Sequence, residues 1–239
     1  SAIDTLGTKS LFSFNAVGKT TSISVNGDKT EFEFDVAGNC IEKRNPDGTL
    51  VRFIVDAEGR NVISTENFIP GNATMATRVF YDSLGRTVRK EILKDFTIER
   101  NGNVTSIGTV GDIVYISLSS YDAVGNLLTS TDGSGCKTRY EYNAVGLCTA
   151  VIDHWGNRFE TEYDALGRKV RTKDALGNIT SYEYDAIGRT TKTIFPDGSY
   201  ISNSFDNMGR KISSTDASGI TTKFKYDDKN LIAVEKSSD

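Results

Sequence analysis

The sequence is poor in the residues on which most active sites depend. One histidine, His154, and three cysteines occur in 239 residues, so any Ser-His-Asp or Cys-His arrangement has to use His154. That histidine lies in Asp-His-Trp-Gly, a turn sequence, and we interpret it as an ordinary turn residue. We therefore expect no enzyme activity and no cofactor.

Metal-binding patterns are also missing. No Cys-x-x-Cys pair or Cys/His cluster indicates zinc. The aspartates are numerous, but they match neither the EF-hand spacing nor the glycine-rich β-roll repeat that binds calcium. We interpret them as turn-capping residues and predict no metal site.

Two further absences narrow the class of protein. No run of about 18 apolar residues occurs, so the sequence predicts no membrane-spanning segment. The net charge is −4 and the basic residues are scattered, which argues against a nucleic-acid partner. With only 3 prolines and a hydrophobic fraction of 37%, the composition is that of a folded protein rather than a disordered one.

What the sequence does contain is a repeated motif, an aromatic residue followed by Asp-x-x-Gly. From Gly125 onward the glycines of successive copies are 21 residues apart, and a fixed period of this kind indicates a repeat architecture. Asn230 replaces the glycine in the last copy. The glycines of the other copies are Gly18, Gly38, Gly59, Gly85, Gly125, Gly146, Gly167, Gly188 and Gly209.

The residues of one copy predict a β-hairpin. In Asp-x-x-Gly the aspartate suits the first position of a type I turn and the glycine suits the left-handed position that follows, which together give a hairpin with a glycine bulge. Residues 138–142 and 180–184 alternate rings and charges before the turn, as strands do. A second Asp-x-x-Gly, at Asp174 to Gly177, closes the unit. We predict an all-β array of antiparallel hairpins that add edge to edge.

The array extends over residues 1–239 as a single domain, with regular repeats at 121–230 and irregular ones at about 64–120. Asn26-Gly27 predicts a tight hairpin. Residues 68–72 suggest a loop insertion. The 40-residue step from Gly85 to Gly125 is nearly two units, so we place a missing motif turn at Asn101-Gly102 and an alternate turn at Gly111-Asp112.

The three cysteines, Cys40, Cys136 and Cys148, are predicted to be free thiols. Cys40 and Cys148 belong to distant repeats. Cys136 and Cys148 flank the turn at Gly146, but if Tyr142 pairs with Leu147, then Cys148 lies opposite Glu141. Neither arrangement brings two sulfur atoms to disulfide distance.

The pattern x-Tyr-x-Tyr-Asp-x-x-Gly-Arg, followed about seven residues later by Asp-x-x-Gly, resembles the YD repeat of the RHS family. That family includes bacterial Rhs proteins, insecticidal toxin-complex subunits and teneurins. The resemblance implies a spiralling ribbon of hairpins, which in long members closes into a hollow shell around a toxic C-terminal domain. It also implies a secreted or cell-surface bacterial protein. The residues that match best, and for which it implies a structural role in the repeat, are Tyr163, Asp164, Gly167, Arg168, Tyr184, Asp185, Gly188 and Arg189.

The 239 residues contain neither the Asp-Pro-x-Gly signature of the family's self-cleaving end nor an unrelated toxin domain, and in both respects they depart from the family pattern. Two strands per unit at ~4.8 Å each make about ten units into a ribbon ~100 Å long. A ring of that length is roughly 30 Å across, which is too small to enclose a folded domain. We expect a segment of a larger shell or a short solitary array.

The side chains leave a choice between a scaffold and a binding module. The tyrosine stripe can be a sugar-binding platform or a cross-strand ladder of stacked rings, and we favour the ladder. Arginines that follow a turn glycine can bind anions, but a stack on tyrosine or an ion pair with a turn aspartate is favoured. Trp155, at a predicted turn tip, is a possible contact residue. The stripe comprises Tyr140, Tyr142, Tyr163, Tyr182, Tyr184 and Tyr226, and the arginines are Arg86, Arg168, Arg189 and Arg210.

We therefore predict a structural YD-repeat segment that scaffolds or encapsulates a toxin or effector module. Its partners would be other parts of the same large protein, such as further repeats and a toxin or adhesin domain. The alternative is a surface module that binds glycans or a partner protein. A row of exposed aromatic rings on one face would favour the alternative, and aromatic rings held between units would favour the scaffold.

Overall fold

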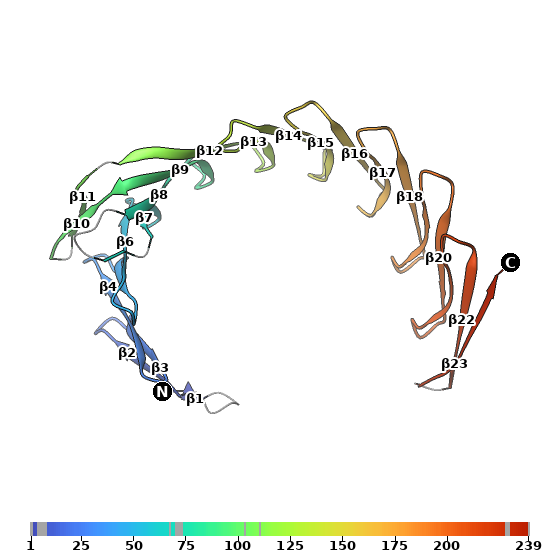
Figure 1. Ribbon diagram of the computed structural model, residues 1–239, viewed down its shortest axis with the longest axis horizontal. Helices are drawn as coiled ribbons and strands as arrows, with labels where there is room; N and C mark the ends of the chain where they lie inside the picture. The colour runs from blue at the N-terminus through green and yellow to red at the C-terminus, as the bar shows by residue number, and fades with distance from the viewer. Residues whose placement is uncertain are drawn as a thin grey trace. The chain divides into compact units, whose positions relative to one another are not determined.

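The computed structural model describes all residues except 1, 4–8, 67, 70–73, 103, 110, 228–229 and 239. Within the described residues the chain forms β-strands and no helix, as predicted (Figure 1). No helix capable of crossing a membrane is found in this part of the chain. Contacts between Cα atoms divide the molecule into two compact units, unit 1 with residues 1–120 and 130–136, and unit 2 with residues 121–129 and 137–239.

Unit 1 is an antiparallel meander with one inserted hairpin. Strands β1 to β9 pair in chain order, and β12 pairs with β9. Strands β10 and β11 pair only with each other. The strands are β1 (Ala2–Ile3), β2 (Lys9–Phe14), β3 (Thr20–Val25), β4 (Asp28–Phe34), β5 (Cys40–Arg44), β6 (Leu50–Val55), β7 (Asn61–Thr65), β8 (Thr74–Tyr81), β9 (Thr87–Phe96), β10 (Ile98–Asn101), β11 (Val104–Ile107) and β12 (Asp112–Tyr121).

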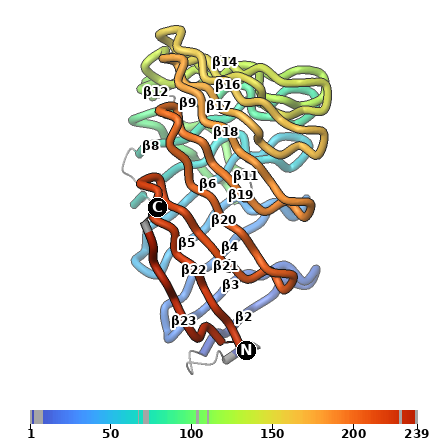
Figure 2. Tube along the Cα trace, turned by 90° about the vertical axis from the view of Figure 1, so that its right-hand side faces the viewer, coloured from blue at the N-terminus to red at the C-terminus, as the bar shows by residue number. Residues whose placement is uncertain are grey.

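Unit 2 is a regular meander whose strands zigzag between two rows of turns (Figure 2). From β14 to β23 each strand pairs with the next one in the chain, and β13 contributes residues to both units. The strands are β13 (Leu127–Thr131), β14 (Lys137–Tyr142), β15 (Cys148–Ile152), β16 (Arg158–Tyr163), β17 (Lys169–Lys173), β18 (Ile179–Tyr184), β19 (Thr190–Ile194), β20 (Tyr200–Phe205), β21 (Lys211–Thr215), β22 (Ile220–Asp227) and β23 (Asn230–Ser238).

The turn chemistry follows the prediction. In the turn between β16 and β17, Gly167 N–H donates to the Asp164 carbonyl at 3.0 Å, and Asp164 N–H donates to the Arg168 carbonyl at 3.0 Å. Gly167 has a φ of 78°, the left-handed region that glycine occupies without strain. All nine predicted turn glycines have positive φ. Asn26 and Gly27, with φ of 53° and 100°, form the expected two-residue turn between β3 and β4.

A second irregularity, which the pattern did not predict, accompanies the turns of the motif. Tyr163 pairs with Lys169, but Glu162 pairs with Arg171, so Val170 is an extra residue in β17. The predicted pairing of Tyr142 with Leu147 is wrong for a different reason. Leu147 already closes the turn through its hydrogen bond from Asn143, so Tyr142 lies opposite Cys148.

The alternate turns use the same hydrogen bonds without this bulge. Asp174 and Gly177 repeat the turn geometry, while Lys173 pairs with Ile179 and Thr172 with Thr180 in unbroken register. The bulge of the motif turn twists and bends each hairpin locally. The two rows of turns are therefore not equivalent.

The irregular part contains one unit with an insertion, and not nearly two units. After β9 the chain forms the β10–β11 hairpin and then returns as β12 to pair with β9. The turn predicted at Asn101-Gly102 lies at the tip of this hairpin. Gly111-Asp112 is no alternate turn, because Asp112 begins β12 opposite Lys94. Of the predicted loop insertion, Phe68 bridges to Leu50, and residues 70–72 lie outside the described residues.

The buried core lies mainly in unit 1. Ile63, Ala76, Leu93, Phe96 and Ile98 form one hydrophobic cluster where β7, β8 and β9 meet the inserted hairpin. In unit 2 the fully buried hydrophobic residues among those described are Ala150 and Ile152. A single sheet with so small a core needs other contacts between its strands. The cysteines are free thiols.

Candidate functional site

The residues of the motif meet at each turn. Asp164 lies in the turn after β16, and its Oδ1 accepts hydrogen bonds from the backbone N–H groups of Leu166 and Arg168 at 2.9 and 3.0 Å. Its Oδ2 accepts from Nε of Arg168 at 2.7 Å. The pKa of Asp164 is held below its usual range, first by the backbone N–H of Arg168 and then by its side chain. The carboxylate thus organises the turn and fixes the arginine.

The same arginine reaches the next repeat. The Arg168 guanidinium lies 4.7 Å from the centroid of the Tyr184 ring, and Nη1 donates to the Asp185 carbonyl at 3.2 Å. The sequence predicted either an ion pair with a turn aspartate or a stack on a tyrosine ring. Arg168 makes both contacts with one side chain. The pairs Arg60–Tyr81, Arg189–Phe205 and Arg210–Tyr226 repeat the ring contact at 4.6, 4.3 and 4.6 Å.

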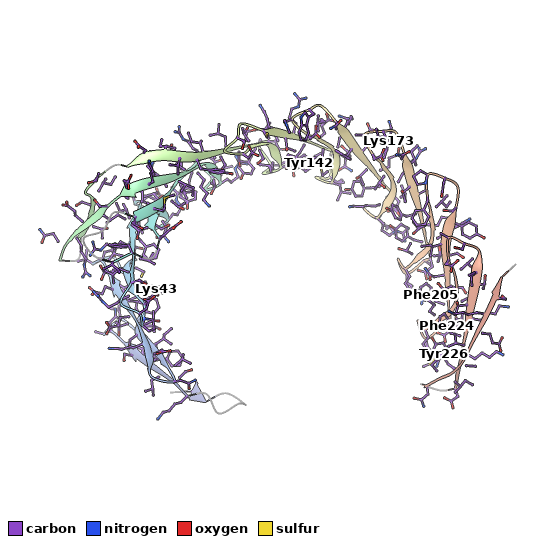
Figure 3. All side chains as sticks on the ribbon, viewed as in Figure 1. Lys43, Tyr142, Lys173, Phe205, Phe224 and Tyr226 are labelled. Carbon is purple, nitrogen blue, oxygen red and sulfur yellow. The ribbon has the colours of Figure 1, made fainter. Side chains whose placement is uncertain are left out.

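In four repeats of unit 2 the hydroxyl of the tyrosine before the motif turn points back toward the preceding repeat. Tyr184 OH donates to the Lys169 carbonyl at 2.6 Å, and Tyr163 OH donates to the Cys148 carbonyl at 2.9 Å. Tyr142 and Tyr226 bond the carbonyls of Leu127 and Lys211 in the same way (Figure 3). We call the turn aspartate, its arginine and the next repeat's ring the clasp.

The predicted ladder of stacked tyrosines is wrong. All six tyrosines of the stripe are described, and none is in ring-to-ring contact with another; the ring pair found among the described residues is His154 with Trp155. Rings two strands apart are ~10 Å from each other, beyond stacking distance. The arginine guanidinium occupies part of that space.

One clasp in unit 2 lacks the hydrogen bond that a tyrosine hydroxyl makes elsewhere. Phe205 occupies the tyrosine position and has no hydroxyl to donate to a carbonyl of the preceding repeat. Arg189 lies over this ring and pairs with Asp185 at 2.6 Å, but its buried Nη1 has no hydrogen-bond partner. Gly188, in the same turn, has a φ of 89°.

Trp155 lies at the tip of the turn between β15 and β16 and is 77% exposed. Its ring centroid lies 3.5 Å from that of His154, with 41° between the planes, and its backbone N–H donates to Asp153. The described part of the chain contains no group of three His, Cys, Asp or Glu side chains that could hold a metal ion.

Unit 1 contains a cavity of about 420 Å³, lined by Arg52, Phe68, Phe96, Ile98 and Arg100 among others. Both arginines of this cavity form hydrogen bonds or ion pairs with other groups of the protein. Arg52 Nε donates to the Glu42 carboxylate at 2.9 Å, and Nη1 donates to the Ile98 carbonyl at 2.7 Å.

Arg100 pairs with Glu42 at 3.3 Å and with Glu33. Glu42 is 2% exposed, so this network is a buried anchor for the β10–β11 hairpin. No sequence pattern marked Glu42, Arg52 or Arg100, because they are brought together from strands distant in the chain.

Comparisons with known proteins identify the repeat. The family model of the RHS Repeat matches residues 121–155 and 163–200, where the period is regular. A comparison with curated proteins finds no match.

Among solved structures, the crystal structure of TcdB2-TccC3 without its hypervariable C-terminal region is similar, with a TM-score of 0.51 and 17% identity over 94% of this chain. The crystal structure of TcdB2-TccC3-Cdc42 and a mutant Tc holotoxin pore of Photorhabdus luminescens have TM-scores of 0.36 and 0.35, at 15% and 16% identity, over 96% of this chain. This chain spans 14% of the first of these chains and 16% of the other two. The first likeness shows the fold alone, an antiparallel β-meander like that of the matched stretch of that chain.

Proposed function

This chain carries RHS repeats, and from that premise we propose that it is a structural segment that scaffolds or encloses a toxin or effector module of the same protein. The observation that carries the proposal is the clasp. The most regular polar and aromatic side chains of the repeat, such as Arg168 and Tyr184, are used in holding one repeat to the next. A side chain that holds adjacent repeats together stabilises the sheet and is not available to bind a substrate.

We extend the proposal to the whole chain, so that residues 1–239 form a single array with the inserted hairpin as an elaboration of one repeat. The solved TcdB2-TccC3 chain is about seven times longer than the stretch matched here, since this chain spans 14% of it, and it is described with a hypervariable C-terminal region. Further repeats and a variable toxin or adhesin module are the partners that this likeness suggests. A secreted or cell-surface location in a bacterium belongs to the same proposal.

The test uses the complete gene product that contains this segment. Limited proteolysis of the wild type should leave the non-repeat module protected, whereas the double variant Arg168→Ala/Arg189→Ala should expose it. Arg171→Ala is the matched control, because Arg171 is a surface arginine on β17 whose ion pair with Glu162 stays within one hairpin. If the module is cleaved as fast in the wild type as when it is expressed alone, the enclosing role is wrong.

A surface module that binds glycans or a partner protein is the second candidate, and the exposure of Trp155 is the observation that favours it. The tyrosines do not support this candidate, because Tyr142, Tyr163, Tyr184 and Tyr226 bond the preceding repeat. Glycan-array signals lost in Trp155→Ala but kept in Leu176→Ala would establish it, since Leu176 occupies the matching position of the next turn in this row.

A further inference from the structure

Five successive turns of one row in unit 2 carry an apolar side chain at the tip. We call the row of motif turns, which end at Gly125, Gly146, Gly167, Gly188 and Gly209, edge A. The alternate turns at the other ends of the strands, which end at Gly156, Gly177, Gly198 and Gly219, form edge B (Figure 2). The residues before the glycines of edge A are 70 to 84% exposed, and they are Val124, Val145, Leu166, Ile187 and Met208.

The turn itself does not require these apolar residues. On edge B the residue before the glycine is Trp155, Leu176, Asp197 or Ser218, and each of these turns has the same glycine hydrogen bond as the turns of edge A. Type I turns accept most residue types at this position. An uninterrupted row of five exposed apolar tips therefore needs a reason outside the local backbone, such as contact with another surface.

Hollows lie between successive tips of edge A. A cavity of about 620 Å³ separates the turns of Val124 and Val145 and is also lined by Leu128 and Tyr142. A second, of about 280 Å³, lies between the turns of Ile187 and Met208 and is lined by Ile187 and Phe205. The tips recur once per repeat, which is ~10 Å along the sheet, so edge A presents projections at a constant spacing with hollows in two of the gaps between them.

The charges of the two edges differ. On edge A, Asp164, Asp185 and Asp206 are ion-paired with the arginine of the same turn at 2.6 to 2.7 Å. On edge B, Asp153 and Asp174 bond asparagine side chains instead. The turn aspartates of edge B are Asp153, Asp174, Asp197 and Asp216. Among the described residues, none of these four forms a salt bridge. Two copies of edge B would repel each other, whereas two copies of edge A would not.

We propose that edge A is a self-association surface that receives edge A of a second copy of this chain, related by a two-fold axis. An identical edge necessarily has the same spacing of tips and hollows, so that the tips of one copy enter the hollows of the other. A two-fold interface requires this kind of self-complementary patch. Five tips per copy would bury less than the roughly 800 Å² per partner of a standard interface, so we expect a weak dimer that is populated only at high protein concentration. The inference does not depend on the proposed scaffold.

The experiment is sedimentation velocity of the full chain at rising concentration. The wild type should pass from monomer to dimer. Leu166→Ser/Ile187→Ser should weaken the dimer at least tenfold, and Leu176→Ser on edge B should leave it unchanged. Leu176 is the matched control because it occupies the same turn position and is 88% exposed. Circular dichroism should be equal for all three proteins. A wild type that stays monomeric, or a dimer unaffected by the edge A substitutions, overturns the proposal.

Cross-linking gives an independent measurement. Leu166 is the middle tip of the row, so the two-fold axis places it beside the same residue of the other copy. With a short thiol-reactive cross-linker, Leu166→Cys should yield a covalent dimer several times faster than Leu176→Cys in the same background. Equal rates overturn the two-fold arrangement.

Discussion

An arginine that follows a turn glycine makes contacts in two repeats at once, as Arg168 illustrates. Arg168 combines an ion pair with Asp164 in its own turn, a stack on Tyr184 and a hydrogen bond to the Asp185 carbonyl. Only a planar, multidentate cation offers a face for a ring and several donors for oxygen atoms, so lysine is not an equivalent replacement. Where the next ring is Phe205, the arrangement loses a hydroxyl, and Arg189 has an unpartnered Nη1.

Restoring the hydroxyl should stabilise this position. Phe205 pairs with Lys211 just as Tyr184 pairs with Thr190, so in Phe205→Tyr the new hydroxyl reaches the Thr190 carbonyl, fifteen residues earlier. We expect a gain of about 1 kcal/mol in the free energy of unfolding, measured by urea denaturation. Tyr184→Phe, which removes the bond to Lys169, should cost a similar amount. Unchanged midpoints in both variants would show that the backward hydrogen bond is not stabilising.

At the scale of the element, the unit of construction is a hairpin with two irregularities. The glycine supplies the left-handed residue of the turn. The bulge lies next to the residue paired with the tyrosine, whose hydroxyl bonds a backbone carbonyl of the preceding hairpin, as Tyr163 does with Cys148. The turn carboxylate connects these features, because it accepts backbone N–H groups and holds the arginine. The hairpin therefore depends on an ionised aspartate.

Acid should destabilise the hairpins. The pKa of Asp164 is lowered in the fold, first by the Arg168 backbone N–H and then by its side chain, and that of Asp82 is lowered in the same order. A carboxyl whose folded-state pKa is lowered contributes stability that is complete above its unfolded value of about 3.9 and is lost as pH falls through the folded value. We expect urea midpoints to fall as pH drops from about 5 through this window.

Asp164→Asn tests the assignment. Asparagine keeps the backbone acceptor, as Asn143 does for Val145 and Leu147, but it has no charge to lose. This variant should be less stable at neutral pH and should show a shallower decline in acid. Equal declines in the variant and the wild type would place the acid sensitivity elsewhere.

For the whole molecule, the two units differ in how far their contacts reach along the chain. In unit 2 each strand from β14 onward pairs with the next strand in the chain, and the clasps join adjacent repeats. In unit 1, Arg52 bonds the Ile98 carbonyl and Arg100 pairs with Glu33, so distant strands depend on one another. A nearest-neighbour stack tolerates truncation, whereas a closed core does not.

The fragment 121–239 should therefore fold without the preceding residues. We expect it to retain the strand signal in circular dichroism and to unfold cooperatively, because each repeat keeps its neighbours. By contrast, removing residues 98–107 from unit 1 takes Phe96 and Leu93 out of contact with Ile98 and should lower stability markedly. Loss of strand signal in the fragment would mean that unit 2 needs long-range contacts.

Local chemistry was sufficient to predict the repeat, the antiparallel hairpins and the turn glycines. The conformation of an Asp-x-x-Gly turn depends only on its own four residues. A position that needs positive φ, such as that of Gly167, is recognised from the glycine itself. Because the period is a constant 21 residues, the prediction made for one hairpin applies to the following repeats as well. The all-β class needed nothing beyond this, and Arg168 was correctly expected to contact either a ring or a turn aspartate.

Only the tertiary structure decided how the repeats hold each other and where the array is interrupted. The bulge at Val170, the hydroxyl that reaches a carbonyl fifteen residues earlier and the arginine that fills the space between rings depend on register between strands, which periodicity does not encode. The β10–β11 hairpin was mistaken for part of a repeat because Asn-Gly is a turn signal wherever it occurs and does not show which strands it connects. Its true place depends on the pairing of β12 with β9 and on Arg52, Glu42 and Arg100, which are adjacent in space although they are far apart in the chain.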